Sequence, residues 1–123
     1  MNPNIRIIEA KIKYDDLKEL CAAGFGEMVK IVVDIKKGII SIGGELHADG
    51  EELLLERGCQ QINLWGANFY PWHSPDDRVE YSALINIRPK SNNPHMDIHD
   101  LELRNEIKKI TEALLLGPDE ELV

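Results

Sequence analysis

The stretch Met28–Gly44, MVKIVVDIKKGIISIGG, decides the fold of this chain. Its first half carries apolar side chains at every second position: Val29, Ile31, Val33 and Ile35. That period is typical of a β-strand with one buried face. Residues 36–38, KKG, place a glycine where a tight turn needs a left-handed backbone, and residues 39–42 continue with a second apolar run. The stretch therefore predicts a β-hairpin.

The hairpin is apolar on both of its faces if Ile35 pairs with Ile39. The second face then holds Val32, Ile40 and Ile42. A sheet that is apolar on both faces has to be covered on both. We expect helices to cover one face, and a second copy of the chain or a long loop to cover the other.

The segment before the hairpin predicts one strand and one helix. Residues 5–8 read as a short apolar strand, and a helix opens at Tyr14 and ends near Gly24 or Gly26. Two aspartates near its start are candidate caps: Asp15 and Asp16.

The second half of the chain predicts two strands and a final helix. Residues 60–71, QQINLWGANFYP, indicate a strand with a bulge at Gly66, and residues 79–87 alternate as a half-buried strand does. Asp100 is the expected N-cap of the final helix. One face of that helix is apolar, at Leu103, Ile107, Ile110 and Leu114. Residues 118–123 follow as a short acidic tail.

These elements define the predicted fold class. A chain of 123 residues fits a single domain, 1–123, with a core of its own. With a short helix after Asp49, the order is β-α-β-β-α-β-β-α. We expect an α+β fold, with a mainly antiparallel sheet of about five strands and about three helices packed on one side.

Composition excludes several classes of partner. The formal net charge is -8, and no basic stripe exists to neutralise phosphates, so neither nucleic acid nor an anionic membrane surface is expected. No segment has the pattern of a membrane span or a secretory signal, which favours a cytoplasmic location. The two cysteines, Cys21 and Cys59, lack the CxxC spacing, and we interpret them as buried apolar residues. No cofactor is indicated.

Glu45, His47 and Asp49 lie at every second position between an apolar run and a helix. In an extended backbone all three share one side, where two carboxylates and an imidazole can hold a divalent metal. A competing interpretation makes Asp49 the N-cap of a helix that ends before Gly58, with Glu52 completing a capping box.

A second acidic cluster follows the tryptophan-containing strand. Asp76, Asp77 and Glu80 gather carboxylates in one loop, as a weak calcium site does, and Asp97 and Asp100 are further candidate ligands. The cluster lacks the EF-hand pattern, so a solvated turn is the alternative interpretation.

A third candidate site combines aromatic and amide side chains on neighbouring strands. Its members are Trp65, Asn68, Tyr70, Trp72, Asn86 and Arg88. Rigid aromatic residues and arginine are enriched at the centres of binding surfaces. The alternative is that Trp65 belongs to the core and the asparagines satisfy backbone amides. No phosphate-binding loop, nucleophile elbow or HExxH motif is present.

Three strings in this chain, GGELHAD (43–49), LWGANFYP (64–71) and INIRP (85–89), resemble a family of small prokaryotic proteins catalogued only as a domain of unknown function. The resemblance covers residues from about Val29 to Leu115. It implies a soluble, single-domain prokaryotic protein. It brings no activity, ligand or catalytic residue.

The leading hypothesis from these patterns is a non-catalytic cytoplasmic binding or interaction module. Its expected partner is a second copy of the chain or another protein, bound through the apolar hairpin and the aromatic cluster. Two alternatives remain open. One is a small metal-dependent hydrolase in which Glu45, His47 and Asp49 hold an ion that activates water. The other is a calcium-binding module.

Overall fold

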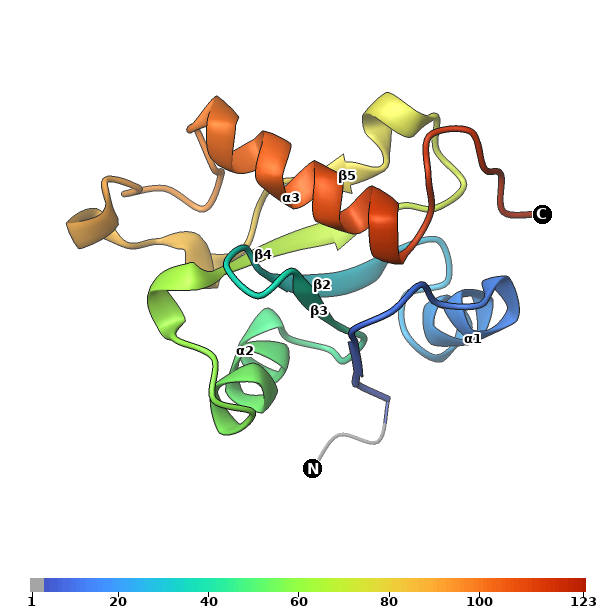
Figure 1. Ribbon diagram of the computed structural model, residues 1–123, viewed down its shortest axis with the longest axis horizontal. Coiled ribbons are helices and arrows are strands. Elements are labelled where there is room, and N and C mark those ends of the chain that lie inside the picture. Colours follow the sequence, from blue (N-terminus) through green and yellow to red (C-terminus); the bar gives the residue numbers. More distant parts are fainter. Residues whose placement is uncertain (1–3) are drawn as a thin grey trace.

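The computed structural model describes residues 4–123 and has the predicted order β-α-β-β-α-β-β-α (Figure 1). Its sheet is open and antiparallel, with five strands in the order β1-β3-β2-β4-β5. The elements are β1 (Arg6–Ile8), α1 (Tyr14–Ala23), β2 (Val29–Asp34), β3 (Ile39–Ile42), α2 (His47–Glu56), β4 (Leu64–Phe69), β5 (Val79–Glu80) and α3 (Leu101–Leu114). The α+β class is confirmed.

The hairpin is confirmed, with a register that differs by one residue from the predicted one. Asp34 pairs with Ile39, so Ile35 falls in the turn. The carboxylate of Asp34 explains this, because its Oδ1 accepts hydrogen bonds from the backbone N–H groups of Lys36 and Lys37, both at 2.9 Å. Gly38 completes the turn with φ +67°, a conformation that favours glycine.

The sheet is covered on both faces, so the prediction that all helices pack on one side is wrong. Alternate residues of β2 separate the two cores: Val29, Ile31 and Val33 face α1 and α3, whereas Val32 faces α2. Figure 1 shows α3 and α2 lying apart, with β2 and β3 between them. The chain therefore covers both apolar faces of its own hairpin.

The predicted strand over residues 79–87 is mostly wrong, and so is the bulge at Gly66. β5 ends at Glu80, and residues 84–86 form a single turn of 3-10 helix. β4 pairs with β2 residue by residue, Val32 opposite Gly66. A glycine is needed there for another reason: a Cβ would lie 2.6 Å from the Cβ of Ala83.

Helix N-caps agree with prediction in one case of three, although α1 begins at its predicted residue. Asp100 caps α3, because its side chain accepts from the N–H groups of residues 102 and 103 at 3.0 and 3.3 Å. α2 begins two residues before Asp49 with Leu46 as its N-cap, so the prediction that Asp49 is the cap is wrong. α1 has Lys13 as its N-cap, and the predicted caps lie in its first turn: Asp15 and Asp16.

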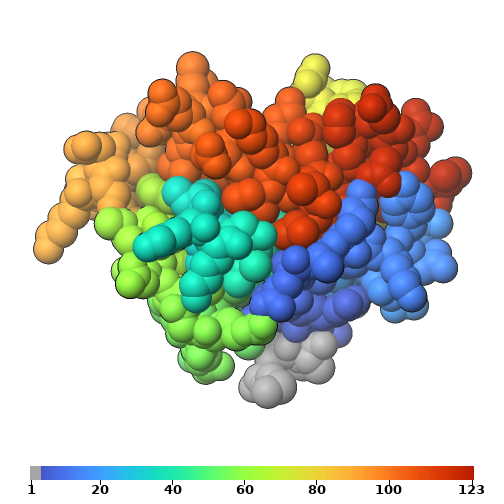
Figure 2. All heavy atoms as spheres, viewed as in Figure 1, coloured from blue at the N-terminus to red at the C-terminus, as the bar shows by residue number. Residues whose placement is uncertain are grey.

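The acidic tail is packed against the domain. Arg78, only 5% exposed, donates to the backbone carbonyls of Gly117 and Glu120 at 2.9 and 2.6 Å. The Glu120 carboxylate accepts from Lys11 and Tyr14, and these bonds lower its pKa to about 2. Figure 2 shows the red C-terminal residues beside the blue N-terminal ones. Within residues 4–123, no helix has the length and apolarity needed to span a membrane.

Candidate functional site

A pocket of about 420 Å³ lies between the start of α2 and residues 82–85. We call it the α2 pocket. Its volume is within the roughly 300–1,000 Å³ common for small-molecule sites. It has a polar lining of Lys30, His47, Asn68, Glu80 and Ser82, and an apolar lining that includes Leu46, Leu84, Ile85 and Met96.

Three of the polar residues form a row across the sheet. Lys30 on β2 is opposite Asn68 on β4, and Asn68 is opposite Glu80 on β5. Side chains of directly paired residues point to the same face of a sheet. The register of three strands therefore brings a cation, an amide and a carboxylate together on the face that α2 covers.

Asn68 has one satisfied and one unsatisfied polar atom. Its Nδ2 donates to Glu80 Oε1 at 2.7 Å, and the Tyr70 hydroxyl donates to the same oxygen at 3.5 Å. Because an ionised carboxylate only accepts hydrogen bonds, the amide nitrogen must face Glu80 and the amide oxygen must face away. That oxygen, Oδ1, is buried and has no hydrogen-bond partner among residues 4–123.

His47 is held in one tautomer. Its Nε2 lies 2.8 Å from the carbonyl oxygen of Ala67, which only accepts, so Nε2 carries the proton. Burial lowers the pKa of His47 more than the Ala67 hydrogen bond and the Asn68 and Glu80 side chains raise it, and Lys30 lowers it further. The imidazole is therefore neutral at pH 7, with Nδ1 as an acceptor.

The lowered pKa of His47 predicts a pH dependence of stability. In the unfolded chain the group titrates near 6.5, and in the folded protein it titrates lower, so the unfolded state binds more protons between these values. We expect the free energy of unfolding to be constant above about pH 7 and to fall as the pH drops below about 6.5. Urea titrations across this range measure it. His47→Gln should flatten the fall, whereas the exposed control His95→Gln should keep it.

The mouth of the α2 pocket is apolar. Leu46 is 60% exposed, Leu84 70% and Met96 43%, although large apolar side chains are usually buried. Leu46 is also the N-cap of α2 and makes no side-chain cap bond, and its carbonyl accepts from the Asp49 N–H at 3.1 Å. An apolar rim above a few polar groups is the usual composition of a small-molecule site.

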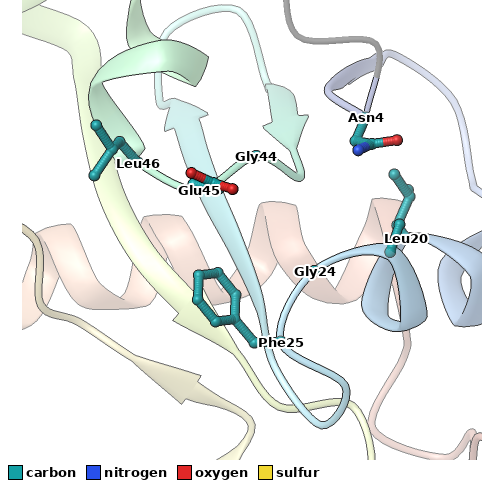
Figure 3. A pocket seen from close by; sticks show the side chains of 8 residues that line it. Asn4, Leu20, Gly24, Phe25, Gly44, Glu45 and Leu46 are labelled. Carbon is teal, nitrogen blue, oxygen red and sulfur yellow. The ribbon is translucent and has the colours of Figure 1, made fainter.

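A second pocket, also about 420 Å³, lies beside the first between the end of α1 and Gly44–Leu46. Figure 3 shows the side chains of Phe25, Glu45 and Leu46 around it. Glu45 lines this second pocket, whereas His47 lines the first, with Leu46 in both. Residues 4–123 contain no group of three or more His, Cys, Asp or Glu placed to hold a metal, so Glu45, His47 and Asp49 do not form the predicted cluster.

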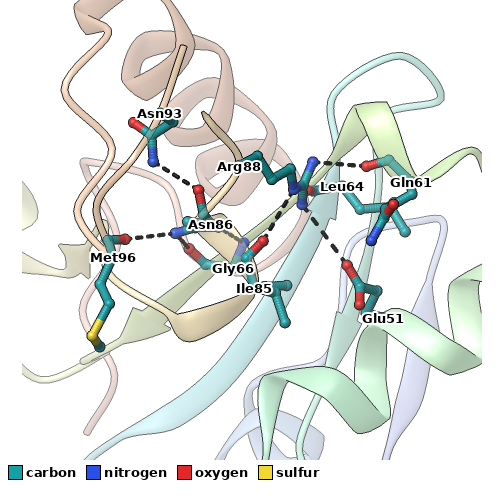
Figure 4. Close-up of polar contacts among 9 residues, drawn as sticks. All are labelled: Glu51, Gln61, Leu64, Gly66, Ile85, Asn86, Arg88, Asn93 and Met96. Carbon is teal, nitrogen blue, oxygen red and sulfur yellow. Dashed lines mark hydrogen bonds and ion pairs between the residues drawn. The ribbon is translucent and has the colours of Figure 1, made fainter. Parts of the chain in front are cut away.

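The buried side chain of Asn86 joins three segments (Figure 4). Its Oδ1 accepts from the Gly66 N–H at 2.8 Å, and its Nδ2 donates to the Gly66 carbonyl at 2.9 Å and to the Met96 carbonyl at 3.1 Å. Asn93 donates to the backbone carbonyl of Asn86 at 2.8 Å. Asn86 thus satisfies the backbone groups of Gly66 at the edge of β4, as a neighbouring strand would. This favours the interpretation that Asn86 satisfies backbone amides.

Arg88 binds backbone carbonyl groups near the start of β4 and in the turn at residues 84–86. It donates to the carbonyls of Gln61 at 2.8 Å and Ile85 at 3.0 Å, and to that of Leu64 (Figure 4). Its guanidinium lies 3.8 Å from a Glu51 carboxylate oxygen and 4.4 Å from the centre of the Trp65 ring. Burial lowers the pKa of Arg88 and Glu51 opposes that shift, so the arginine remains charged. These contacts indicate a structural role for Arg88.

The predicted aromatic cluster is divided between three places. Trp65 belongs to the core, with 5% exposure, and lies near Arg88. Asn68 is in the α2 pocket, and Tyr70 reaches Glu80 beside it while stacking on His73. Trp72 is 45% exposed and lies near the C-terminal tail. The binding role of these residues stays a prediction.

The predicted calcium ligands have separate partners. Asp76 pairs with Lys108, Asp77 accepts from the Ser74 hydroxyl, and Glu80 accepts from Asn68. Asp100 caps α3. No cluster of carboxylates able to hold an ion is formed in the part of the chain that the structure describes, in agreement with these pairings.

Sequence reasoning missed Lys30. A usable signal was present for Lys30, because it is a charged residue inside a mainly apolar strand and shares the period of Val32 and Asp34. A lysine on a strand face that a helix covers indicates a polar site beneath that helix.

Comparisons with known proteins identify a family and no activity. A family model matches residues 6–114, and its description reads "Protein of unknown function (DUF5674)". No curated protein and no solved structure matches the chain.

Proposed function

The chain belongs to the DUF5674 family, whose description names no activity, and we propose that it is a non-catalytic binding module for a small organic ligand. The ligand occupies the α2 pocket. The observation that carries this proposal is the buried Asn68 Oδ1, which has no hydrogen-bond partner within residues 4–123 and belongs to a residue that lines a pocket with an apolar mouth. A ligand that donates a hydrogen bond there would satisfy it.

Binding is favoured over catalysis by the state of the nucleophiles. Burial raises the pKa of both Cys21 and Cys59 to about 11, so at neutral pH neither is a thiolate. His47 is near Asn68 and Glu80 and its Nε2 proton is engaged by a backbone carbonyl, which orients the ring as a hydrogen-bonding group. Both cysteines are free and buried, which supports a reducing compartment such as the cytoplasm.

Filling the pocket tests this proposal. Ala48 lines the pocket and is exposed, so Ala48→Phe should obstruct it without disturbing the core. We expect amide chemical shifts of Lys30, His47 and Asn68 to respond saturably to members of a small-molecule fragment library. In Ala48→Phe the same fragments should lose at least tenfold in affinity.

Ala113→Phe is the matched control, because Ala113 is also exposed on a helix and lies on α3. It should bind the fragments as the parent protein does. Fragment binding that is unchanged in Ala48→Phe, or a library that gives no shifts around the pocket, would refute the proposal.

Self-association was expected because both hairpin faces are apolar, and this chain covers both faces itself. That part of the proposal now rests on exposed apolar side chains such as Trp72 and Leu101, which is 71% exposed. Light scattering over a range of concentrations tests it. A mass that stays at 14.0 kDa excludes self-association, and twice that mass supports a dimer.

A further inference from the structure

The polar row in the α2 pocket has a positive end and a negative end. Lys30 lies at one end and Glu80 at the other, with Asn68 between them in register. Two strand spacings, about 9.5 Å, separate the backbones of the two charged residues, and both side chains are long enough to reach toward a shared ligand.

Neither charge is neutralised by a neighbour. Among the described residues Lys30 and Glu80 form no ion pair; the Lys30 ammonium lies 5.4 Å from the centre of the Phe25 ring. Glu80 accepts hydrogen bonds only from the neutral groups of Asn68 and Tyr70. The pocket therefore presents an uncompensated cation and an uncompensated anion on either side of an unsatisfied amide oxygen.

We infer that the α2 pocket binds a zwitterion with an apolar side chain, namely an α-amino acid of the leucine or methionine type. This inference rests on the proposed function. The ammonium of the ligand donates to Glu80, and its carboxylate binds the Lys30 ammonium. Its apolar side chain packs against the mouth of the pocket, formed by Leu46, Leu84 and Met96.

The two charged ends make the pocket selective. A carboxylic acid without the amine offers Glu80 no hydrogen-bond donor and brings its charge near that carboxylate. An amine without the carboxylate brings a second cation near Lys30. Binding sites that hydrogen-bond a ligand group discriminate strongly against analogues that lack it, because the site is then left with unpaired polar atoms.

Calorimetric titration with three related probes tests the inference: L-leucine, 4-methylpentanoic acid, which lacks the amine, and 3-methylbutylamine, which lacks the carboxylate. We expect saturable binding of leucine at millimolar concentration. Each truncated analogue should bind at least tenfold more weakly.

Two variants identify which residue contacts which group. Glu80→Gln should weaken leucine binding at least fivefold but should not weaken 4-methylpentanoic acid, which is freed from repulsion by Glu80. Lys30→Met should weaken leucine binding but should not weaken 3-methylbutylamine, which is freed from repulsion by Lys30. Glu106→Gln, an exposed change on α3, is the control and should change nothing.

Equal affinity for leucine and 4-methylpentanoic acid would overturn the inference, and so would the absence of saturable leucine binding. Neither result decides the proposed function, which the fragment experiment with Ala48→Phe tests on its own. If library fragments still bind and Ala48→Phe still prevents it, the pocket is a ligand site for another chemical class.

Discussion

Replacing Asn86 with leucine should lower the free energy of unfolding by about 3–5 kcal/mol. Leucine has a similar shape but makes no hydrogen bond. The change leaves the N–H and carbonyl of Gly66 without their present partner beside a side chain that is 0% exposed, and the carbonyl of Met96 keeps only the Ala83 N–H, at 3.2 Å. Each buried polar group that loses its partner costs about 1–3 kcal/mol.

Urea denaturation followed by circular dichroism measures this loss. Asn105→Leu is the matched control, because Asn105 is exposed on α3, and it should change stability by less than about 0.5 kcal/mol. If Asn86→Leu lowers the free energy of unfolding by less than about 1 kcal/mol, the Asn86 side chain does not satisfy the edge of β4 in the way a strand would.

Replacing Arg88 with methionine should cost about 2–4 kcal/mol. Methionine keeps much of the apolar length but releases the carbonyls of Gln61, Leu64 and Ile85. It also leaves the Glu51 carboxylate, whose side chain is 14% exposed, without the nearby charge of Arg88. When one partner of a partly buried ion pair is removed, most of the lost stability comes from the charge that is left without its partner.

A double-mutant cycle separates the carbonyl contacts from the charge. Glu51→Gln removes the unpaired charge, so Arg88→Met combined with Glu51→Gln should be more stable than Arg88→Met alone. The same unfolding measurement applies. If the two single changes add without coupling, the Arg88–Glu51 pair contributes nothing and the effect of Arg88 comes from its carbonyl contacts.

Local sequence patterns predicted the elements whose cause is local. The alternation in β2 and the turn at Gly38 are properties of neighbouring residues, and so is the Asp100 cap of α3. The start of α2 was misplaced because any aspartate near a helix start satisfies the capping rule. Its position is set by packing: Gly50 meets β3 so closely that a Cβ would lie 2.5 Å from Ser41 Oγ.

The strand predicted over residues 79–87 shows a different limit. Its alternation is real, but period alone does not reveal that a side chain can take the place of a neighbouring strand. Asn86 binds both polar groups of the Gly66 backbone, and residues 84–86 then turn instead of extending. The Asn86 side chain can take the place of a strand only through a contact between residues that are 20 apart in sequence.

The candidate site was predicted only in part. Asn68, Tyr70 and His47 were chosen for their chemistry, and the α2 pocket contains Asn68 and His47 with Tyr70 beside it. Their grouping with Lys30 and Glu80 required the register of three strands, which no single segment encodes. Trp72 was grouped by nearness in sequence, and it lies elsewhere, near the tail.

A crystallographic fragment screen tests the central claim, a ligand site in the α2 pocket, most directly. Crystals are soaked with small molecules that combine a hydrogen-bond donor with an apolar group. We predict electron density in the pocket, with the donor atom within hydrogen-bonding distance of Asn68 Oδ1 and the apolar group against Leu46 and Leu84. Fragments that bind only at other places on the surface, with the α2 pocket open to solvent in those crystals, would contradict the claim.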